Sequence, residues 1–197
     1  MTDRKFIPVN IAILTISDSR TFENDRSGDV LANCIESAGH ILKNREIVKD
    51  DRPLISAKLM EWCKRIDIDT IITTGGTGLT GRDVSVEAHR DVYEKEIDAF
   101  ATMFTIISMK KIRTSAVQSR ACAGVAHGTY LFALPGSPGA CMDGWEEILK
   151  YQLDYTHKPC NFVEIMPRLE ENKKRKSQNQ MKLVIENLQE SIMIFDK

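Results

Sequence analysis

The chain has 197 residues, of which 42% are hydrophobic and 28% charged, and its formal net charge is −1. This length fits one domain with a short appendage, and the near-neutral charge disfavours a nucleic-acid-binding protein, whose domain would be strongly basic. No apolar run approaches the roughly 18–20 residues that span a bilayer, and the polar first residues do not predict a signal peptide. The five cysteines form no C-x-x-C pair, which is typical of reduced thiols, so we expect a cytoplasmic protein without a membrane or nucleic-acid partner.

The first half of the chain alternates strand and helix patterns. Residues 10–17 are apolar and β-branched, as in a central strand of a parallel sheet. A helix with one apolar stripe follows, with Ser27 as its expected N-cap and Gly39 just beyond its C-terminal end. Residues 40–48 predict a second strand, and Pro53 suits the first turn of the next helix.

The alternation continues in the second half. Residues 70–74 and 130–134 predict two more buried strands, a helical pattern runs from residue 85 through 107, and a last helix covers 141–149. Residues 112–125 are less periodic and receive no element. We therefore expect a three-layer α/β/α fold with a mostly parallel sheet and right-handed crossovers.

A glycine-rich loop follows the third predicted strand. Gly75, Gly76 and Gly78 leave the backbone free to present its N–H groups to an anion, although a tight turn without a ligand is the alternative. The stretch from Gly76 to Gly81 also fits the dinucleotide pattern G-x-G-x-x-G, but no acid-ended strand follows at the required distance. A carboxylate at Asp83 would repel bound phosphates unless a cation lies between them, so the loop favours Mg²⁺-phosphate over NAD.

Polar or Gly/Pro-rich segments follow four of the predicted strands. In open α/β sheets, ligands bind at the carboxyl ends of the strands, so we expect these segments to meet at one crevice. They are residues 17–20, 49–53, 75–83 and 135–139.

Six motifs are shared with one known family: Ile16-Ser17-Asp18, Asp25-Arg26-Ser27-Gly28, Thr74-Gly75-Gly76-Thr77-Gly78, Arg82-Asp83-Val84, Gln118-Ser119-Arg120 and Leu134-Pro135-Gly136-Ser137-Pro138. On these motifs, residues 5–169 resemble the MoaB/Mog family of molybdenum-cofactor biosynthesis proteins, whose fold also occurs in the N-terminal domain of gephyrin. Residues 157–162 resemble the MoaB branch more than the Mog branch. The expected organisation is a molybdopterin-binding domain over residues 1–169, followed by residues 170–197.

The resemblance implies a molybdopterin adenylyltransferase. Such an enzyme converts ATP and molybdopterin into adenylyl-molybdopterin and pyrophosphate and uses Mg²⁺. The resemblance also implies a homotrimer, and some MoaB proteins pair two trimers into a hexamer. Some MoaB proteins lack the transferase activity, so a trimer that binds molybdopterin or nucleotide without turnover is the alternative. The presence of Pro138, and of acids at positions 50 and 83, favours the enzyme.

Asp50 and Asp83 match the two acidic positions of active family members, which makes them the candidate catalytic residues and Mg²⁺ ligands. Asp51 is the alternative to Asp50, the other of the two then simply starting a helix. We expect the backbone N–H groups of residues 75–78, with the Thr77 hydroxyl, to bind a phosphate.

The remaining candidates bind the substrates. Ser119 and Arg120 offer a hydroxyl and a forked cation for the pterin phosphate, with a surface ion pair as the alternative for the arginine. Ser17 and Asp18 either cap a helix or contact a ligand. The rigid loop of Pro135, Gly136, Ser137 and Pro138 can stack on or hydrogen-bond a nucleotide base. We interpret His89 and His127 as structural or surface residues, and the scattered histidines predict no zinc site.

The last 28 residues differ from the rest. Residues 170–176 form a charged linker. Beyond it, apolar residues recur at helical spacing, which predicts an amphipathic helix that docks on a neighbouring subunit or packs or frays at the end of its own chain. These apolar residues are Met181, Ile185, Leu188, Ile192 and Phe195.

Overall fold

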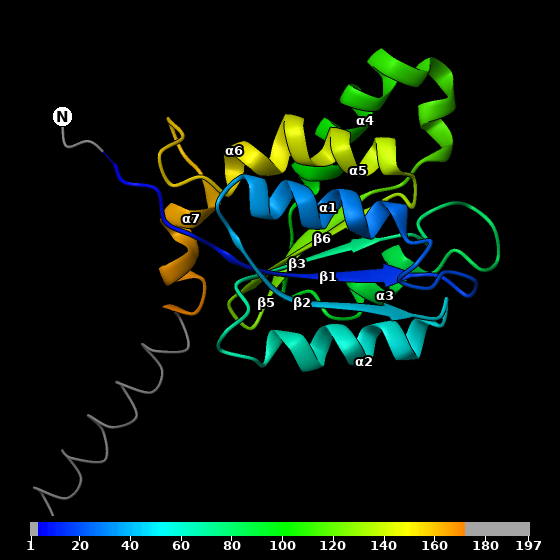
Figure 1. Ribbon diagram of the computed structural model, residues 1–197, viewed down its shortest axis with the longest axis horizontal. Coiled ribbons are helices and arrows are strands. Elements are labelled where there is room, and N and C mark those ends of the chain that lie inside the picture. The colour runs from blue at the N-terminus through cyan, green and yellow to red at the C-terminus, as the bar shows by residue number, and fades with distance from the viewer. Residues whose placement is uncertain (1–3, 172–197) are drawn as a thin grey trace, which may run out of the picture.

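A computed structural model describes residues 4–171 (Figure 1). Its centre is a six-stranded sheet with strand order β2-β1-β3-β6-β5-β4. The neighbours among β2, β1, β3 and β6 pair in parallel, whereas β5 pairs antiparallel to β6 and β4 antiparallel to β5. The strands are β1 (Asn10–Ile16), β2 (Ile41–Val48), β3 (Thr70–Thr74), β4 (Lys95–Glu96), β5 (Cys122–Ala126) and β6 (Thr129–Leu134).

Helices cover both faces of this sheet. α1, α4, α5 and α6 lie on one side, and α2 and α3 lie on the other (Figure 1). The predicted three-layer architecture with a mostly parallel sheet is therefore confirmed, and the sheet is mixed because β5 runs antiparallel to its two neighbours. The helices are α1 (Arg26–Ser37), α2 (Arg52–Cys63), α3 (Ser85–Arg90), α4 (Asp98–Ile112), the 3₁₀ helix η1 (Arg113–Gln118), α5 (Pro138–Gly144), the π-helical turn η2 (Trp145–Leu149), α6 (Lys150–Gln152), α7 (Phe162–Ile165) and the 3₁₀ turn η3 (Met166–Arg168).

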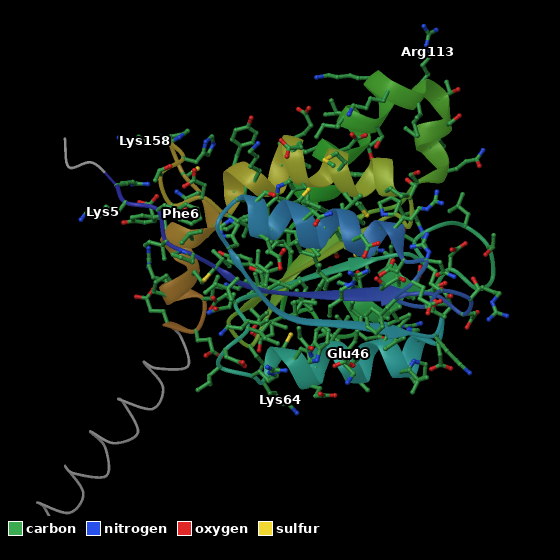
Figure 2. The ribbon with its side chains drawn as sticks, in the orientation of Figure 1. Lys5, Phe6, Glu46, Lys64, Arg113 and Lys158 are labelled. Carbon is green, nitrogen blue, oxygen red and sulfur yellow. The ribbon has the colours of Figure 1, made fainter. Side chains whose placement is uncertain are left out.

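Two apolar cores separate the layers, because alternate residues of each strand point to opposite faces. From β1, Ile11 and Ile13 pack with α1, α4 and η2, and Ala12 and Leu14 pack with α2 and α3. Side chains fill both interlayer spaces (Figure 2). The continuous apolar run that predicted a central strand follows from this burial on both faces.

The four parallel strands end level with one another. Ile16 of β1 is opposite Val48 of β2, Thr74 of β3 is opposite Thr15 of β1, and Thr74 is also opposite Leu134 of β6. The four segments expected to meet therefore leave the sheet at one edge. Lys5, Phe6 and α7 lie at the other end of the molecule (Figures 1 and 2).

Several local predictions are confirmed. Gly39 follows α1 with a φ of +83°, and Pro53 lies in the first turn of α2. The predicted N-cap of α1 is wrong: the side chain of Asp25, not that of Ser27, accepts a hydrogen bond from the backbone of Gly28.

The region between residues 85 and 126 departs most from prediction. The expected long helix is two helices, α3 and α4, separated by the short edge strand β4, and Ile97 precedes α4 instead of lying in it. β5 was missed because its small residues lack the β-branched pattern. Gly124 of β5 leaves room for the Tyr93 ring, since a Cβ there would lie 2.4 Å from that ring.

The amphipathic helix expected between residues 181 and 195 lies outside the described residues, and the boundary at residue 169 stays a prediction. Within residues 4–171, no helix combines the length and apolar character needed to cross a membrane.

Candidate active site

The carbonyl oxygens of the glycine loop after β3 accept hydrogen bonds from residues outside residues 75–78. Ser85 donates from its hydroxyl to the Gly75 carbonyl at 2.6 Å and from its backbone N–H to the Gly76 carbonyl at 2.9 Å. The Arg120 Nε–H donates to the carbonyls of Thr77 and Gly78, each at 2.9 Å. Four consecutive carbonyls thus accept hydrogen bonds, two from Ser85 of α3 and two from Arg120, which lies two residues before β5.

The amides of the same loop are differently placed. The Gly75 N–H donates to the Leu134 carbonyl at 3.1 Å. Among residues 4–171, none accepts a hydrogen bond from the N–H groups of Gly76 or Thr77, whereas the Gly78 N–H is directed at the Asp83 carboxylate and helps to lower the pKa of that group. Gly75 and Gly76 have positive φ values, +103° and +61°, as the turning backbone requires. Successive free N–H groups with their carbonyls bound elsewhere form a concave anion-binding surface.

Two carboxylates flank this loop. A Cβ on Gly76 would lie 2.8 Å from the Asp50 Oδ1, and a Cβ on Gly78 would lie 2.7 Å from the Asp83 Oδ2. Asp50 comes from the segment after β2, and its Oδ2 accepts a hydrogen bond from the Asp18 N–H at 3.0 Å. The structure therefore brings together the acids that the sequence singled out and places both beside the glycines.

The two carboxyl groups differ in their electrostatics. Burial, and then the nearby charge of Asp83, raise the pKa of Asp50 above its ordinary value. The pKa of Asp83 is lowered, mainly by the hydrogen bond from the Thr80 hydroxyl. Two like charges beside an anion site are stable together when a divalent cation neutralises them, and carboxylate oxygens are ligands that Mg²⁺ prefers. Asp50 and Asp83 could supply two oxygen ligands to Mg²⁺, and residues 4–171 contain no cluster of three or more His, Cys, Asp or Glu side chains that could hold a metal ion.

Asp51, the alternative acid, has a structural role. Its side chain accepts a hydrogen bond from the Leu54 N–H at 2.9 Å and caps α2. This geometry favours Asp50 over Asp51 as the acid that faces the glycine loop.

Ser17 and Asp18 order the turn after β1. The Ser17 hydroxyl accepts hydrogen bonds from the N–H groups of Ser19 and Arg20, at 3.3 and 3.2 Å. Asp18 forms an ion pair with Arg82 of the glycine loop. Neither residue caps a helix, and ligand contact stays a prediction for both.

The Pro135–Pro138 segment packs directly on the glycine loop. A Cβ on Gly136 would lie 3.1 Å from the Gly75 Cα, so only glycine permits this approach without a shift. The Gly136 carbonyl accepts hydrogen bonds from Arg20 at 2.6 Å and from the Ser27 hydroxyl at 2.7 Å. Ser137 then caps α5 and Pro138 starts it.

A family model described as "Probable molybdopterin binding domain" matches residues 12–155. The chain belongs to this family. The molybdenum cofactor biosynthesis protein B of Escherichia coli K12 is 44% identical over 158 residues, which cover 80% of this chain and 93% of that protein. The protein of the same name from Bacillus anthracis is 43% identical over 133 residues, which cover 67% of this chain and 79% of that protein.

Solved structures agree with this assignment. A crystal structure of a molybdenum cofactor biosynthesis protein B superposes with a TM-score of 0.77 at 35% identity, covering 85% of this chain and 99% of the other. The tungsten cofactor synthesizing protein MoaB from Pyrococcus furiosus gives a TM-score of 0.65 at 29% identity, with coverages of 72% and 91%. The suggested MoaB/Mog family and its fold are thus confirmed.

The family motif at residues 25–28 has a structural explanation that its sequence did not reveal. Asp25 is fully buried and accepts hydrogen bonds from the Thr15 hydroxyl at 2.7 Å and from Arg45 at 2.9 Å. Burial alone would raise its pKa, but these hydrogen bonds keep the pKa below its ordinary value. Arg20 lies 3.5 Å from the same carboxylate while it binds Gly136, so the buried acid anchors the cation that holds the 135–138 segment.

Ser119 lines a cavity beside this site. The cavity has a volume of about 400 Å³ and lies between α4 and α5. Ser137 also lines this cavity, so two of the residues predicted to bind substrate lie in the same cavity wall. Its other lining residues are Phe104, Ser108, Lys111, Ile112, Gly139, Ala140 and Asp143.

The two histidines singled out lie away from the loop amides. His89 is fully buried, and its ring nitrogens hydrogen-bond the Thr73 hydroxyl at 2.8 Å and the Tyr93 hydroxyl at 2.9 Å. Burial lowers its pKa to about 3, so the ring is neutral. His127 lies in the turn between β5 and β6, beside a larger cavity of about 770 Å³ at the opposite edge of the sheet. The prediction that each histidine is a structural or a surface residue agrees with the burial of His89 and with the position of His127 in a turn.

Proposed function

We propose that the protein acts in molybdenum cofactor biosynthesis by catalysing Mg²⁺-dependent adenylyl transfer from ATP to molybdopterin, which gives adenylyl-molybdopterin and pyrophosphate. The observation that carries this proposal is the polarity of the glycine loop. Its four carbonyls accept hydrogen bonds from Ser85 and Arg120, and the N–H groups of Gly76 and Thr77 are left for an anion between Asp50 and Asp83. This arrangement suits a polyphosphate with a divalent cation.

The reaction joins two anions. The terminal phosphate of molybdopterin attacks the α-phosphorus of ATP, and pyrophosphate leaves with the electron pair of the broken P–O bond. The site therefore has to reduce repulsion and align the reacting groups. The loop amides would bind a phosphate of ATP, and Asp50 and Asp83 would hold Mg²⁺, which supplies neutralisation of phosphate charge when bound.

The cavity between α4 and α5 suits the pterin ring of the second substrate. Phe104 and Ile112 provide apolar walls, and Ser119 and Ser137 provide hydroxyls. The carboxylate of Asp143, whose side chain is 15% exposed, forms an ion pair with Lys111 through one oxygen, and its remaining acceptor positions can receive N–H groups from the 2-amino-4-oxo edge of a pterin. The cavity adjoins the loop through Ser137, so one molecule can extend from it to the phosphate-binding amides.

A homotrimer fits the exposed apolar side chains of α4. Met103, Ile106 and Met109 are 47%, 52% and 53% exposed, and Arg113 at the end of this helix points away from the body of the molecule (Figure 2). We propose that this apolar surface contributes to subunit contacts. Analytical ultracentrifugation of the full chain tests this: Ile106→Asp should lower the trimer fraction, and an unchanged distribution would exclude α4 from the contact.

The transferase is separated from a binding protein by measuring pyrophosphate release. Wild-type protein, molybdopterin and ATP with Mg²⁺ should release pyrophosphate, and the double variant Asp50→Ala, Asp83→Ala should not. Asp51→Asn is the matched control, because asparagine also caps helices and the variant removes a neighbouring carboxylate. If the wild type releases no more pyrophosphate than the double variant, binding without turnover is the only role that remains.

A further inference from the structure

Arg120 contacts the back of the glycine loop and one acidic partner. Besides the two carbonyls bound by its Nε, its Nη2 donates to the Asp83 carbonyl at 3.2 Å. Both terminal nitrogens donate to the Glu87 carboxylate, one of them at 3.2 Å. All three guanidinium nitrogens are therefore engaged with backbone carbonyls or with Glu87.

The charge of Arg120 is balanced where it lies. Glu87 belongs to α3, whose first residue, Ser85, binds the other two loop carbonyls. The hydrogen bond from Arg120 lowers the pKa of Glu87, which keeps the pair ionised. A guanidinium held this way stays on the side of the loop to which the carbonyl oxygens point. Because Glu87 balances its charge, it attracts a phosphate at the N–H groups only weakly.

We propose that Arg120, oriented by Glu87, is a positioning residue that turns the carbonyls of Thr77 and Gly78 away from the bound triphosphate. The same contacts fix the backbone of Asp83. This inference rests on the proposed function, because the anion is the triphosphate of ATP. It replaces the prediction that Arg120 binds the pterin phosphate directly.

Lysine cannot replace arginine in this role. The contacts need a planar fork that reaches two adjacent carbonyls, a third carbonyl and a carboxylate at the same time. An ammonium group carries the same charge but is a point donor. A direct phosphate ligand would tolerate this exchange much better, so Arg120→Lys separates the two roles.

The test is calorimetric titration of the full-length protein with ATP and Mg²⁺, and separately with adenosine. Arg120→Gln and Arg120→Lys should each weaken ATP binding roughly tenfold or more, because carbonyls in the loop lose their donors. Adenosine binding should stay within twofold of wild type. Glu87→Gln should weaken ATP binding roughly threefold, since the guanidinium loses its charged partner.

Arg90→Gln is the matched control. Arg90 is also on α3 and pairs with an acid, Glu96, through contacts of 3.0 and 2.9 Å, but it makes no contact with the glycine loop. This variant should bind ATP like the wild type. Circular dichroism melts of all variants exclude unfolding as the cause of a loss.

Four results would overturn the inference. If Arg120→Lys keeps wild-type ATP affinity, or Glu87→Gln binds ATP more tightly, Arg120 is a phosphate ligand whose charge Glu87 masks. If the Arg120→Gln variant loses affinity for adenosine as much as for ATP, the effect is not specific to phosphate. Tripolyphosphate contains no nucleoside, and its binding requires no turnover. If the wild type binds tripolyphosphate and the variants bind it with the losses predicted for ATP, the positioning role is supported even where no pyrophosphate is released. If the wild type binds neither ATP nor tripolyphosphate, the inference fails.

Discussion

Replacing Gly75 with alanine tests the geometry of the loop most severely. Gly75 has a φ of +103°, and a Cβ there would lie 2.2 Å from the Ile16 carbonyl oxygen. That oxygen belongs to the buried end of β1, where Thr15 pairs with Thr74 and the Ser17 N–H donates to the Val48 carbonyl. The backbone can therefore yield only by disrupting the sheet edge.

The cost follows from two contributions. An alanine in this backbone region carries roughly 1–3 kcal/mol of strain. Relieving an overlap with fixed backbone costs roughly another 1–3 kcal/mol. The total of about 2–6 kcal/mol corresponds to a fall in Tm of roughly 4–24 °C for a domain of this size.

Differential scanning calorimetry of Gly75→Ala measures this fall, with Gly81→Ala as the control. A Cβ on Gly81 would meet no atom of residues 4–171 within 4 Å, and the φ of Gly81 is not positive. The control should change the free energy of unfolding by less than about 0.5 kcal/mol. Equal melting temperatures for the two variants would refute the loop geometry from which the anion site is argued.

Three further predictions follow from single side chains. His89 stays neutral when folded, because its pKa is about 3, whereas the unfolded chain takes up a proton near its ordinary value of 6.5. Stability should therefore fall as pH drops below about 6.5, by up to roughly 1.4 kcal/mol per pH unit from this residue; calorimetry of His89→Gln should show a shallower slope, and an unchanged slope would contradict the assignment. Asp50→Asn removes a carboxylate whose pKa is raised by burial and by Asp83, so at pH 7 without Mg²⁺ the variant should have a Tm up to roughly 4 °C higher than the wild type. This gain in Tm should vanish as the pH falls through the pKa of Asp50, because the wild-type carboxyl group then becomes neutral. A lower Tm for the variant at pH 7 would show that the charge stabilises the fold. Asp143→Asn should weaken binding of a fluorescent pterin roughly tenfold relative to Glu146→Gln, a control that likewise removes an acid paired with a lysine, Lys150, but outside the lining of that cavity. Equal affinities would exclude the α4–α5 cavity as the pterin site.

The architecture was predictable because the buried strands carry strong local signals. Residues 10–16 and 70–74 are apolar and β-branched, and each is followed by residues that break the pattern. β5 and β4 carried no such signal: β5 is made of small residues, and β4 has two residues whose pairing depends on a distant strand. Tertiary pairing decided these elements, and a local pattern does not contain it.

The site was predictable where it depends on backbone. The glycines and the acids at positions 50 and 83 were singled out from the sequence, and the structure places them together. Their binding roles stay predictions. The contacts that hold the loops were missed, because they join residues more than 30 positions apart: Arg20 to Gly136, and Arg120 to Thr77. An arginine beside a motif predicts a cation, but which side of the loop it contacts is set by the fold.

The central claim is that Asp50 and Asp83 hold a divalent cation next to a phosphate bound by the glycine amides. Calorimetric titration of ATP, with and without Mg²⁺, tests it on Asp50→Asn, Asp83→Asn and the Asp51→Asn control. We expect Mg²⁺ to strengthen ATP binding to the wild type and to Asp51→Asn and to have no such effect on the other two variants. Equal strengthening by Mg²⁺ in all four proteins would contradict the claim.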